Sequence, residues 1–326
     1  MSRIVVLGET LIDLGPEGHG PRIGGACANV AVTLARLGRE VALIGAVGDD
    51  AEGAWLVGEI EKAGVEVSCI ARVKGKKTGR VHLSGDGNSW RFRPERSDGA
   101  EWEVTESQLS CLDEKGSWLH LGVSSIAGRL FPIAMRAATN ARVISADLNA
   151  RMVGFESRDA LISSCRALAL MARVLKVSES DLRTLGYETD RDGARALHAA
   201  RIATSSLLQV TIATFGARGA VALANEHELE TPVVEVLDVE PSGAGDAFMA
   251  GIIATMADDG DDDARLATRT TTTKVERALA IASILGAHAT TQIGATTALT
   301  NPRALLGDHA RHIPLDSPRF RSHSST

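Results

Sequence analysis

The clearest chemical signal in this sequence is the segment EPSGAGDAFMAG, which spans residues 240–251. Gly243 and Gly245 permit a tight turn, and the apolar run at 247–256 predicts a helix directly after it. The first N–H groups of a helix lack partners within the helix, so such a turn attracts phosphate. Asp246 falls in that first turn. It could cap the helix, or it could accept a proton from a hydroxyl that attacks a bound phosphate.

Two other glycine clusters occupy similar positions. Gly25 and the glycine before it precede a helical pattern, and Asn29 lies in the first turn of that helix. Asn29 could cap the helix or hydrogen-bond a polar ligand. Thr214, Gly216 and Gly219 follow an apolar strand pattern. They form either a plain hairpin or a loop that lies along a nucleotide.

Short β-branched runs alternate with amphipathic stretches along most of the chain. Strands are expected at residues 4–7, 41–47, 118–121, 143–146, 173–177, 208–214 and 220–224. Helices are expected at residues 28–37, 51–63, 131–140, 158–171 and 192–202. This alternation predicts an α/β fold, with a mostly parallel central sheet covered by helices on both faces. Ligands in such sheets bind at the carboxyl ends of the strands, where the glycine clusters lie.

Two segments break this rhythm. Residues 74–96 alternate polar and apolar side chains around the turn SGDGN, which predicts an antiparallel hairpin protruding from the α/β core. Residues 258–273 contain five Asp followed by a Thr-rich run. Their acidic residues do not have the alternate spacing of a calcium loop, so we expect a solvated surface insertion and no metal site.

Composition excludes several functions. The net charge is −6, with 35 basic and 41 acidic residues, which gives no general attraction to nucleic acid or to acidic membranes. Only 3% of the residues are aromatic, too few for extensive base stacking. No apolar run is long enough to span a bilayer. The four cysteines form no CxxC pair and are expected to be reduced, mostly buried thiols of a cytoplasmic protein.

Taken in order, these motifs resemble the ribokinase-like (PfkB-type) carbohydrate kinases. GGACANVAV at 24–32, with LARLG and VALIGAVGDDAEG after it, is similar to the family's N-terminal signature, and EPSGAGDAFMAG to its C-terminal one. DLNAR at 147–151, KVSESD at 176–181 and TFG at 214–216 match internal motifs. GETLIDL at 8–14 and DGNSWRFR at 86–93 look most like fructokinases, with 2-keto-3-deoxygluconate kinases close behind.

The resemblance implies a three-layer α/β/α sandwich that transfers the γ-phosphate of ATP to a primary hydroxyl of a small sugar. Asp246 would be the general base, and the amides of Gly243, Ala244 and Gly245 would form the anion hole. The sugar would be held by Asp13, Gly25, Asn29, Arg93 and Arg151. The nucleotide would lie along Ser178, Thr214, Gly216, Gly219, Gly243 and Gly245. Asp181 would contact Mg²⁺ through water.

The family pattern also implies one kinase domain over residues 1–326, with an Asp/Thr-rich insertion at about 257–273. A β lid from about 10–24 and 72–96 would close over the sugar and exclude water. Such lids often pair between subunits, which implies a homodimer. The family usually has Asp where Glu240 stands, and that Asp contributes to a monovalent-cation site in some members. This departure puts potassium activation in doubt.

Three alternatives to a fructose kinase stay open from sequence. One is a kinase for 2-keto-3-deoxygluconate, another sugar acid or a nucleoside. Another is a catalytically silent sugar-binding protein on the same fold, although the intact GAGD sequence argues against it. A nicotinamide oxidoreductase would share only the fold, and the chain lacks the GxGxxG loop that dinucleotide binding requires.

Overall fold

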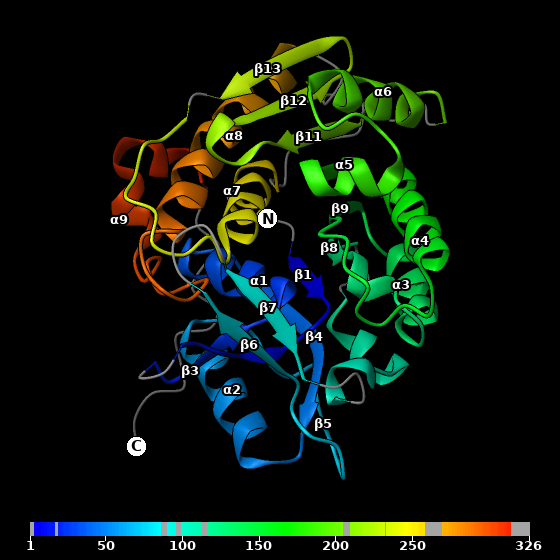
Figure 1. Ribbon diagram of the computed structural model, residues 1–326, viewed down its shortest axis with the longest axis vertical. Helices are drawn as coiled ribbons and strands as arrows, with labels where there is room; N and C mark the ends of the chain where they lie inside the picture. Colours follow the sequence, from blue (N-terminus) through cyan, green and yellow to red (C-terminus); the bar gives the residue numbers. More distant parts are fainter. Residues whose placement is uncertain are drawn as a thin grey trace.

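The computed structural model describes residues 3–16, 19–85, 90–95, 99–112, 116–204, 209–231, 233–257 and 269–313. Its central sheet has nine strands in the order β13-β12-β11-β10-β9-β8-β1-β4-β5 (Figure 1). These are β1 (Ile4–Leu7), β4 (Val41–Gly48), β5 (Ile70–Val73), β8 (Trp118–Gly122), β9 (Val143–Asp147), β10 (Val174–Ser178), β11 (Val210–Thr214), β12 (Ala220–Ala224) and β13 (His227–Thr231). From β11 to β5 all neighbours are parallel, and only β12 and β13 pair antiparallel.

Strand β1 shows why the sheet lies in the middle of the molecule. All four of its side chains are fully buried. Ile4 and Val6 belong to one apolar core, and Val5 and Leu7 to a second one on the other face. A strand buried on both faces must be apolar at every position, which explains why its sequence does not alternate with polar residues.

Helices cover both faces of this sheet (Figure 1). The core that contains Ile4 is closed by α1 (Ala26–Arg36), α2 (Ala51–Lys62), α7 (Ala244–Met256), α8 (Arg269–Ala289) and α9 (Pro302–Leu306). The core that contains Val5 is closed by α3 (Leu130–Thr139), α4 (Arg158–Met171), α5 (Glu179–Leu185) and α6 (Arg191–Ile202). The predicted α/β sandwich is confirmed.

A separate four-stranded sheet, in the order β3-β2-β6-β7, lies beside this core. Its strands are β2 (Leu11–Leu14), β3 (Pro21–Gly24), β6 (Arg80–Ser84) and β7 (Arg91–Pro94). Strands β6 and β7 pair antiparallel, so the hairpin predicted within residues 74–96 is confirmed. Residues 86–89 of its turn, and residue 96, lie outside the described part of the chain.

The other predicted elements agree with the structure to within a few residues at their ends. Residue 208, the expected start of one strand, lies outside the described residues, and β11 begins at Val210. Most of the expected insertion, residues 258–268, also lies outside them. Its last five residues begin α8, so the Thr-rich run at 269–273 is helical.

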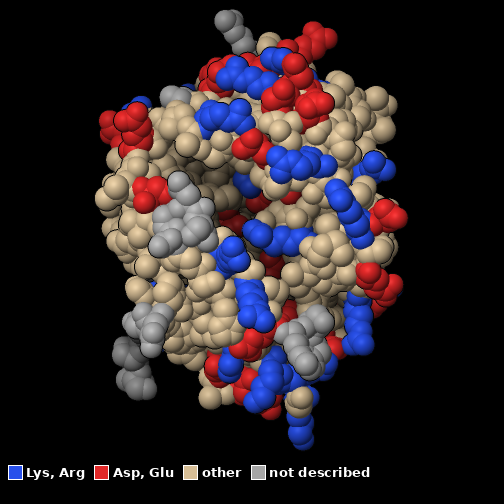
Figure 2. Space-filling model, in the orientation of Figure 1, with Lys and Arg blue, Asp and Glu red and all other residues tan. Residues whose placement is uncertain are grey.

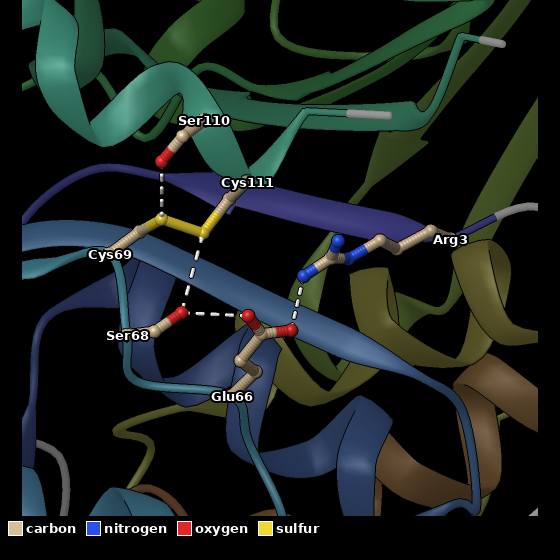
Figure 3. Close-up of a disulfide and its surroundings, with 6 residues drawn as sticks. All are labelled: Arg3, Glu66, Ser68, Cys69, Ser110 and Cys111. Carbon is tan, nitrogen blue, oxygen red and sulfur yellow. Dashed lines mark hydrogen bonds and ion pairs between the residues drawn. A yellow bond between two sulfur atoms is a disulfide. The ribbon is translucent and has the colours of Figure 1, made fainter. Parts of the chain in front are cut away.

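The prediction of four reduced thiols is wrong for two of them. Cys69, just before β5, forms a disulfide with Cys111, the last residue of the short 3₁₀ helix Glu106–Cys111 (Figure 3). Their Cα atoms are 6.3 Å apart although 42 positions separate them in sequence. A pairing made by the approach of two distant elements leaves no spacing signal in the sequence. Cys27 and Cys165 are buried free thiols, as expected.

In the described part of the chain, no helix combines the length and the apolar character that a membrane span needs.

Candidate active site

The candidate site lies at the carboxyl ends of the parallel strands. Asp147 ends β9, Ser178 ends β10 and Thr214 ends β11. Figure 2 shows a hollow in this face of the molecule, with acidic side chains inside it and Lys and Arg side chains around its rim. The site is therefore a cleft whose floor carries carboxylates and whose entrance is positively charged.

Asp246 and Asn29 face each other across this cleft floor. Asn29 Nδ2 donates a hydrogen bond to Asp246 Oδ2 at 2.8 Å. Asp246 thus bonds to a side chain of α1 and does not cap its own helix α7, which begins after Gly243. The Asn29 Oδ1 atom is buried and has no hydrogen-bond partner in the described structure. Both residues are placed to receive a polar ligand, which favours the functional interpretation of each.

Burial controls the ionisation of Asp246. Desolvation raises its pKa to about 7, and the nearby Asp147 carboxylate adds to this, while the Asn29 hydrogen bond and the Lys176 ammonium act in the opposite direction. A carboxyl group that titrates near neutral pH is suited to general base catalysis, because it takes up a proton readily yet is substantially ionised in the cell.

The turn before α7 requires glycine. Gly243 has a φ of +75°, and a Cβ there would lie 2.5 Å from the Ala295 carbonyl oxygen. The amides of Ala244, Gly245 and Asp246 form the first turn of the helix, where N–H groups have no partner within the helix. The Ala244 amide makes one long bond, of 3.4 Å, to the Pro241 carbonyl. The turn can therefore present N–H groups to an anion, and the hole formed by the amides of Gly243, Ala244 and Gly245 stays a prediction.

Glu240 anchors the turn before α7 through hydrogen bonds to two backbone amides. It is fully buried, and its Oε1 accepts from the Ser242 amide at 3.1 Å while its Oε2 accepts from the Gly294 amide at 2.6 Å. One carboxylate thus joins the start of the turn to a loop more than fifty residues away. The side chain that departs from the family pattern is fully engaged in shaping the backbone.

Asp13 is another buried carboxyl group of the site. Desolvation raises its pKa to about 8, with added repulsion from Asp246 and Glu240 and partial relief from Arg22. Its carboxylate packs over Gly24, where a Cβ would lie 2.4 Å from Asp13 Oδ1. Asp13, which is predicted to bind the sugar, is therefore electrostatically coupled to Asp246, the predicted base.

Gly25 starts α1 with a φ of +95° and leaves room for the chain beside it. A Cβ at Gly25 would lie 2.5 Å from the Glu9 carbonyl oxygen. The Glu9 side chain accepts from the Ala26 amide at 3.1 Å and also binds Ser124. Glu9 is a residue that the sequence reading missed, and its carboxylate acts electrostatically on Asp246.

A buried ion pair between Lys176 and Asp147 was also missed. Lys176 Nζ lies 2.8 Å from Asp147 Oδ2, and both side chains are about 95% buried, with 5% and 6% exposed. The other carboxylate oxygen of Asp147 is buried without a partner in the described structure. Both residues lie within the DLNAR and KVSESD motifs, but only a charge inside an otherwise apolar buried strand could have singled them out.

Ser178 and Asp181 form a local capping pair at the start of α5. Asp181 Oδ2 accepts from the Ser178 amide and hydroxyl at 2.8 and 2.7 Å. Its Oδ1 accepts from the Ala150 amide at 2.8 Å, which ties this helix to the loop after β9. Asp181 therefore has a structural role here, and a contact with Mg²⁺ through water would use only its remaining lone pairs.

Thr214, Gly216 and Gly219 form a turn at the end of β11. The Phe215 amide donates to the Gly219 carbonyl at 2.8 Å, which closes the turn. Gly216 has a φ of +57°, and a Cβ there would meet no atom within 4 Å. This glycine thus faces open space that a nucleotide could occupy.

The two predicted arginines lie on different sides of the small sheet. The Arg151 guanidinium carbon lies 5.5 Å from the centre of the Phe92 ring on β7. The loop after β9 therefore contacts the small sheet directly. Strand register pairs Asp13 with Val81 and Leu83 with Phe92, which places Asp13 and Phe92 on the same face. Arg93 pairs with His82 and lies on the opposite face. The structure therefore does not bring Arg93 to Asp13.

These residues fit a phosphorylated ligand with a hydrated metal. The amide-rich turn of α7 suits phosphate oxygens, and buried unpartnered atoms such as Asn29 Oδ1 and Ser242 Oγ border it. Among the described residues, no group of three or more His, Cys, Asp or Glu side chains is arranged to hold a metal directly. A Mg²⁺ ion would therefore be bound chiefly through phosphate oxygens and water, which suits its reluctance to dehydrate.

Comparison with known proteins agrees with this geometry. A family model described as pfkB family carbohydrate kinase matches residues 1–302. A fructokinase of Salmonella typhimurium is 32% identical over 317 residues, which cover 93% of this chain and 98% of that protein.

Two solved structures extend the comparison. Fructokinase from Vibrio cholerae O395, in a form with fructose, ADP and calcium ion bound, has a TM-score of 0.81 and 26% identity, covering 94% of this chain and 98% of that one. Aminoimidazole riboside kinase from Salmonella enterica, complexed with aminoimidazole riboside and an ATP analogue, has a TM-score of 0.79 and 26% identity, covering 94% and 99%.

Proposed function

Because this chain belongs to the pfkB family of carbohydrate kinases, we propose that it transfers the γ-phosphate of ATP to a primary hydroxyl of fructose or a related ketose. The observation that carries the proposal is Asp246, a partly buried carboxyl group with a pKa of about 7 in the first turn of helix α7. Base and anion site are thus adjacent in the chain.

In this mechanism Asp246 accepts the proton of the attacking sugar hydroxyl. Asn29 holds the carboxylate in place through its 2.8 Å hydrogen bond, and its free Oδ1 accepts from a sugar hydroxyl. Asp13 and the backbone around Gly25 bind other hydroxyls of the sugar. These contacts fix the reacting hydroxyl close to both the base and the anion site.

The amides of Gly243, Ala244 and Gly245 stabilise the negative charge of the phosphoryl group in transfer. Bound Mg²⁺ supplies further charge neutralisation at the nucleotide phosphates. The turn at Gly216 and Gly219 lies along the nucleotide, with Thr214 and Ser178 beside it. A relative with ADP and calcium ion bound and another with an ATP analogue support this assignment of a nucleotide and a divalent cation.

We further propose one kinase domain over residues 1–326, in which the four-stranded sheet acts as a lid. Its face with Asp13 and Phe92 would close over the sugar and exclude water. All four residues of β7 are exposed, which leaves surface for a second copy of the chain and a homodimer. Chromatography with light scattering tests the dimer, because a monomeric mass at micromolar protein would exclude it.

We place the activity in the cytoplasm, where ATP is available. The Cys69–Cys111 disulfide removes one ground for that expectation, since disulfides are rare in the cytosol. The location therefore rests on the reaction itself.

The direct test offers the purified protein Mg-ATP with fructose, 2-keto-3-deoxygluconate, ribose or aminoimidazole riboside, and measures ADP release. The proposal expects the largest kcat/KM with fructose. A nucleoside preference would match the other relative, whose substrate is aminoimidazole riboside by its name. Absence of ADP release with every sugar would instead indicate a catalytically silent sugar-binding protein.

A further inference from the structure

The buried ammonium of Lys176 lies directly against the anion-binding turn. A Cβ at Gly245 would be 3.0 Å from Lys176 Nζ and 3.6 Å from its Cε. A side chain at position 245 would therefore crowd the ammonium and force it to shift from its place beside the turn. The amides of the same turn are predicted to bind the phosphoryl group. The positive charge of Lys176 therefore lies next to these amides.

Lys176 remains charged in this position. Burial disfavours the ammonium, but the Asp147 carboxylate outweighs it, with help from Asp181 and Asp246, and the pKa of Lys176 lies above its ordinary value. The nearby His120 is neutral instead, because burial and the Lys176 charge lower its pKa to about 3. The positive charge at this point of the cleft floor thus belongs to the lysine.

Asp147 holds the ammonium close to the turn, since its Oδ2 accepts from Lys176 Nζ and lies 3.8 Å from where a Cβ at Gly245 would be. Only one hydrogen bond to Lys176 Nζ is seen in the described structure, at 2.8 Å from Asp147 Oδ2. An ammonium has three N–H donors, so its capacity exceeds what this one bond uses. A buried cation with unused donors beside an anion site is placed to stabilise negative charge that appears there.

We propose that Lys176 is a positioning residue of phosphoryl transfer: its ammonium, held by Asp147, supplies the positive charge behind the amides of Gly243, Ala244 and Gly245. This inference rests on the proposed kinase function. It gives the pair a role that a structural ion pair does not have, because only the lysine carries the useful charge. The two partners should therefore not be equivalent when each is removed.

The test compares Lys176→Met, Asp147→Asn and the double variant with the wild-type enzyme. Lys176→Met keeps the length of the stem but removes the charge, and we expect kcat to fall about 100-fold with a nearly unchanged KM for the sugar. Asp147→Asn leaves the lysine in place, where the Asp181 and Asp246 carboxylates still favour its charged form, and should lose less. The double variant should be as impaired as Lys176→Met. Lys62→Met, which breaks an exposed lysine–glutamate pair, is the matched control and should behave as wild type.

A structural ion pair gives a different pattern. Both single variants would then lose activity and thermal stability together, and the double variant would recover because no unpaired buried charge remains. That recovery, or a Lys176→Met enzyme with near-normal kcat, would overturn the inference. If Lys176→Met does not fold, the kcat of the double variant tests the same point. The double variant also lacks the positive charge, and it leaves no unpaired carboxylate at position 147.

A second measurement does not depend on turnover. The affinity for ADP with aluminium fluoride, a mimic of the transferring phosphoryl group, is measured in the presence of sugar and compared with that for ADP alone. The charge role predicts that Lys176→Met loses affinity about 100-fold for the mimic and little for ADP. Equal losses for both ligands would contradict it. A wild-type protein that neither turns over any sugar nor binds the mimic would refute the kinase function itself.

Discussion

Asn29 Nδ2 donates a 2.8 Å hydrogen bond to Asp246 Oδ2, and this bond joins two motifs that lie 217 positions apart in the chain. It brings the first turn of α1 to the first turn of α7. Two glycine-led helices thus present their N-termini to one cleft. The bond also favours the ionised form of Asp246, since it lowers a pKa that burial raises.

Removal of this hydrogen bond should raise the pKa of the base. With Asn29→Ala, we expect the acidic limb of the kcat/KM profile, which wild type should show near pH 7, to move up by about one pH unit. Activity at neutral pH falls and is regained only in part at higher pH, because Asn29→Ala also loses the acceptor for a sugar hydroxyl. Asn140→Ala, at the exposed end of α3, is the control. An unshifted limb in Asn29→Ala would show that Asn29 does not govern the base.

Two carboxyl groups of the site, Asp13 and Asp246, predict how the stability of the protein depends on pH. Burial raises the pKa of Asp13 to about 8 and that of Asp246 to about 7, from an ordinary value of 3.8. Between about pH 4 and pH 8 the folded protein therefore binds more protons than the unfolded chain. Its free energy of unfolding should fall as pH rises through this window.

The variant Asp13→Asn removes the larger of these two contributions. Denaturant unfolding of the unliganded protein at pH 5, 7 and 8.5 should show a flatter pH dependence for Asp13→Asn than for wild type. Asp308→Asn, an exposed carboxyl near the end of the described chain, should leave the dependence unchanged. Parallel curves for wild type and Asp13→Asn would contradict the burial argument.

The disulfide should stabilise the fold by an amount that grows with the logarithm of the length of the loop it closes. Cys69 and Cys111 are 42 positions apart, which corresponds to about 4 kcal/mol in the chain-entropy model. We expect dithiothreitol to lower the Tm of wild type. It should have no effect on Cys69→Ser/Cys111→Ser, which starts at the lower value, because Cys27 and Cys165 are already free. If dithiothreitol does not change the Tm of wild type, the Cys69–Cys111 disulfide is absent in solution.

Arg201 is a buried cation that holds together three elements far from the cleft. It donates to the carbonyls of Ala169 at 2.8 Å and Val210 at 2.9 Å, and it also binds the Ala172 carbonyl. The variant Arg201→Met leaves these acceptors unpaired and should cost about 3 kcal/mol. Arg191→Met, which loses only an exposed pair with Glu230, should cost less than about 1 kcal/mol. Similar unfolding midpoints for both variants would contradict this difference.

The sequence predicts the helices, strands and turns of this molecule better than the contacts between distant side chains. Runs such as IVVL in β1 and the glycine-led turn before α7 follow local rules, so periodicity and backbone chemistry locate them. The register of β7 is also readable once the hairpin is known, yet the face of Arg93 depends on which side packs against the core. Strand alternation therefore left its position open.

Long-range pairs could not be derived in the same way. The bond between Cys69 and Cys111 and the ion pair between Asp147 and Lys176 both need the tertiary approach of separate strands and helices. No local pattern encodes such an approach. Glu240 is a similar case, because its second carboxylate oxygen reaches the Gly294 amide across 54 positions.

The central claim is that Asp246 is the base of a sugar kinase, and turnover of fructose with Mg-ATP by Asp246→Asn tests it most directly. We predict that kcat falls by about 1,000-fold or more while fructose still binds, because the amide keeps the shape of the site but cannot take the proton. Asp159→Asn, an exposed carboxyl at the start of α4, should match wild type. An Asp246→Asn enzyme with near-wild-type kcat would contradict the account.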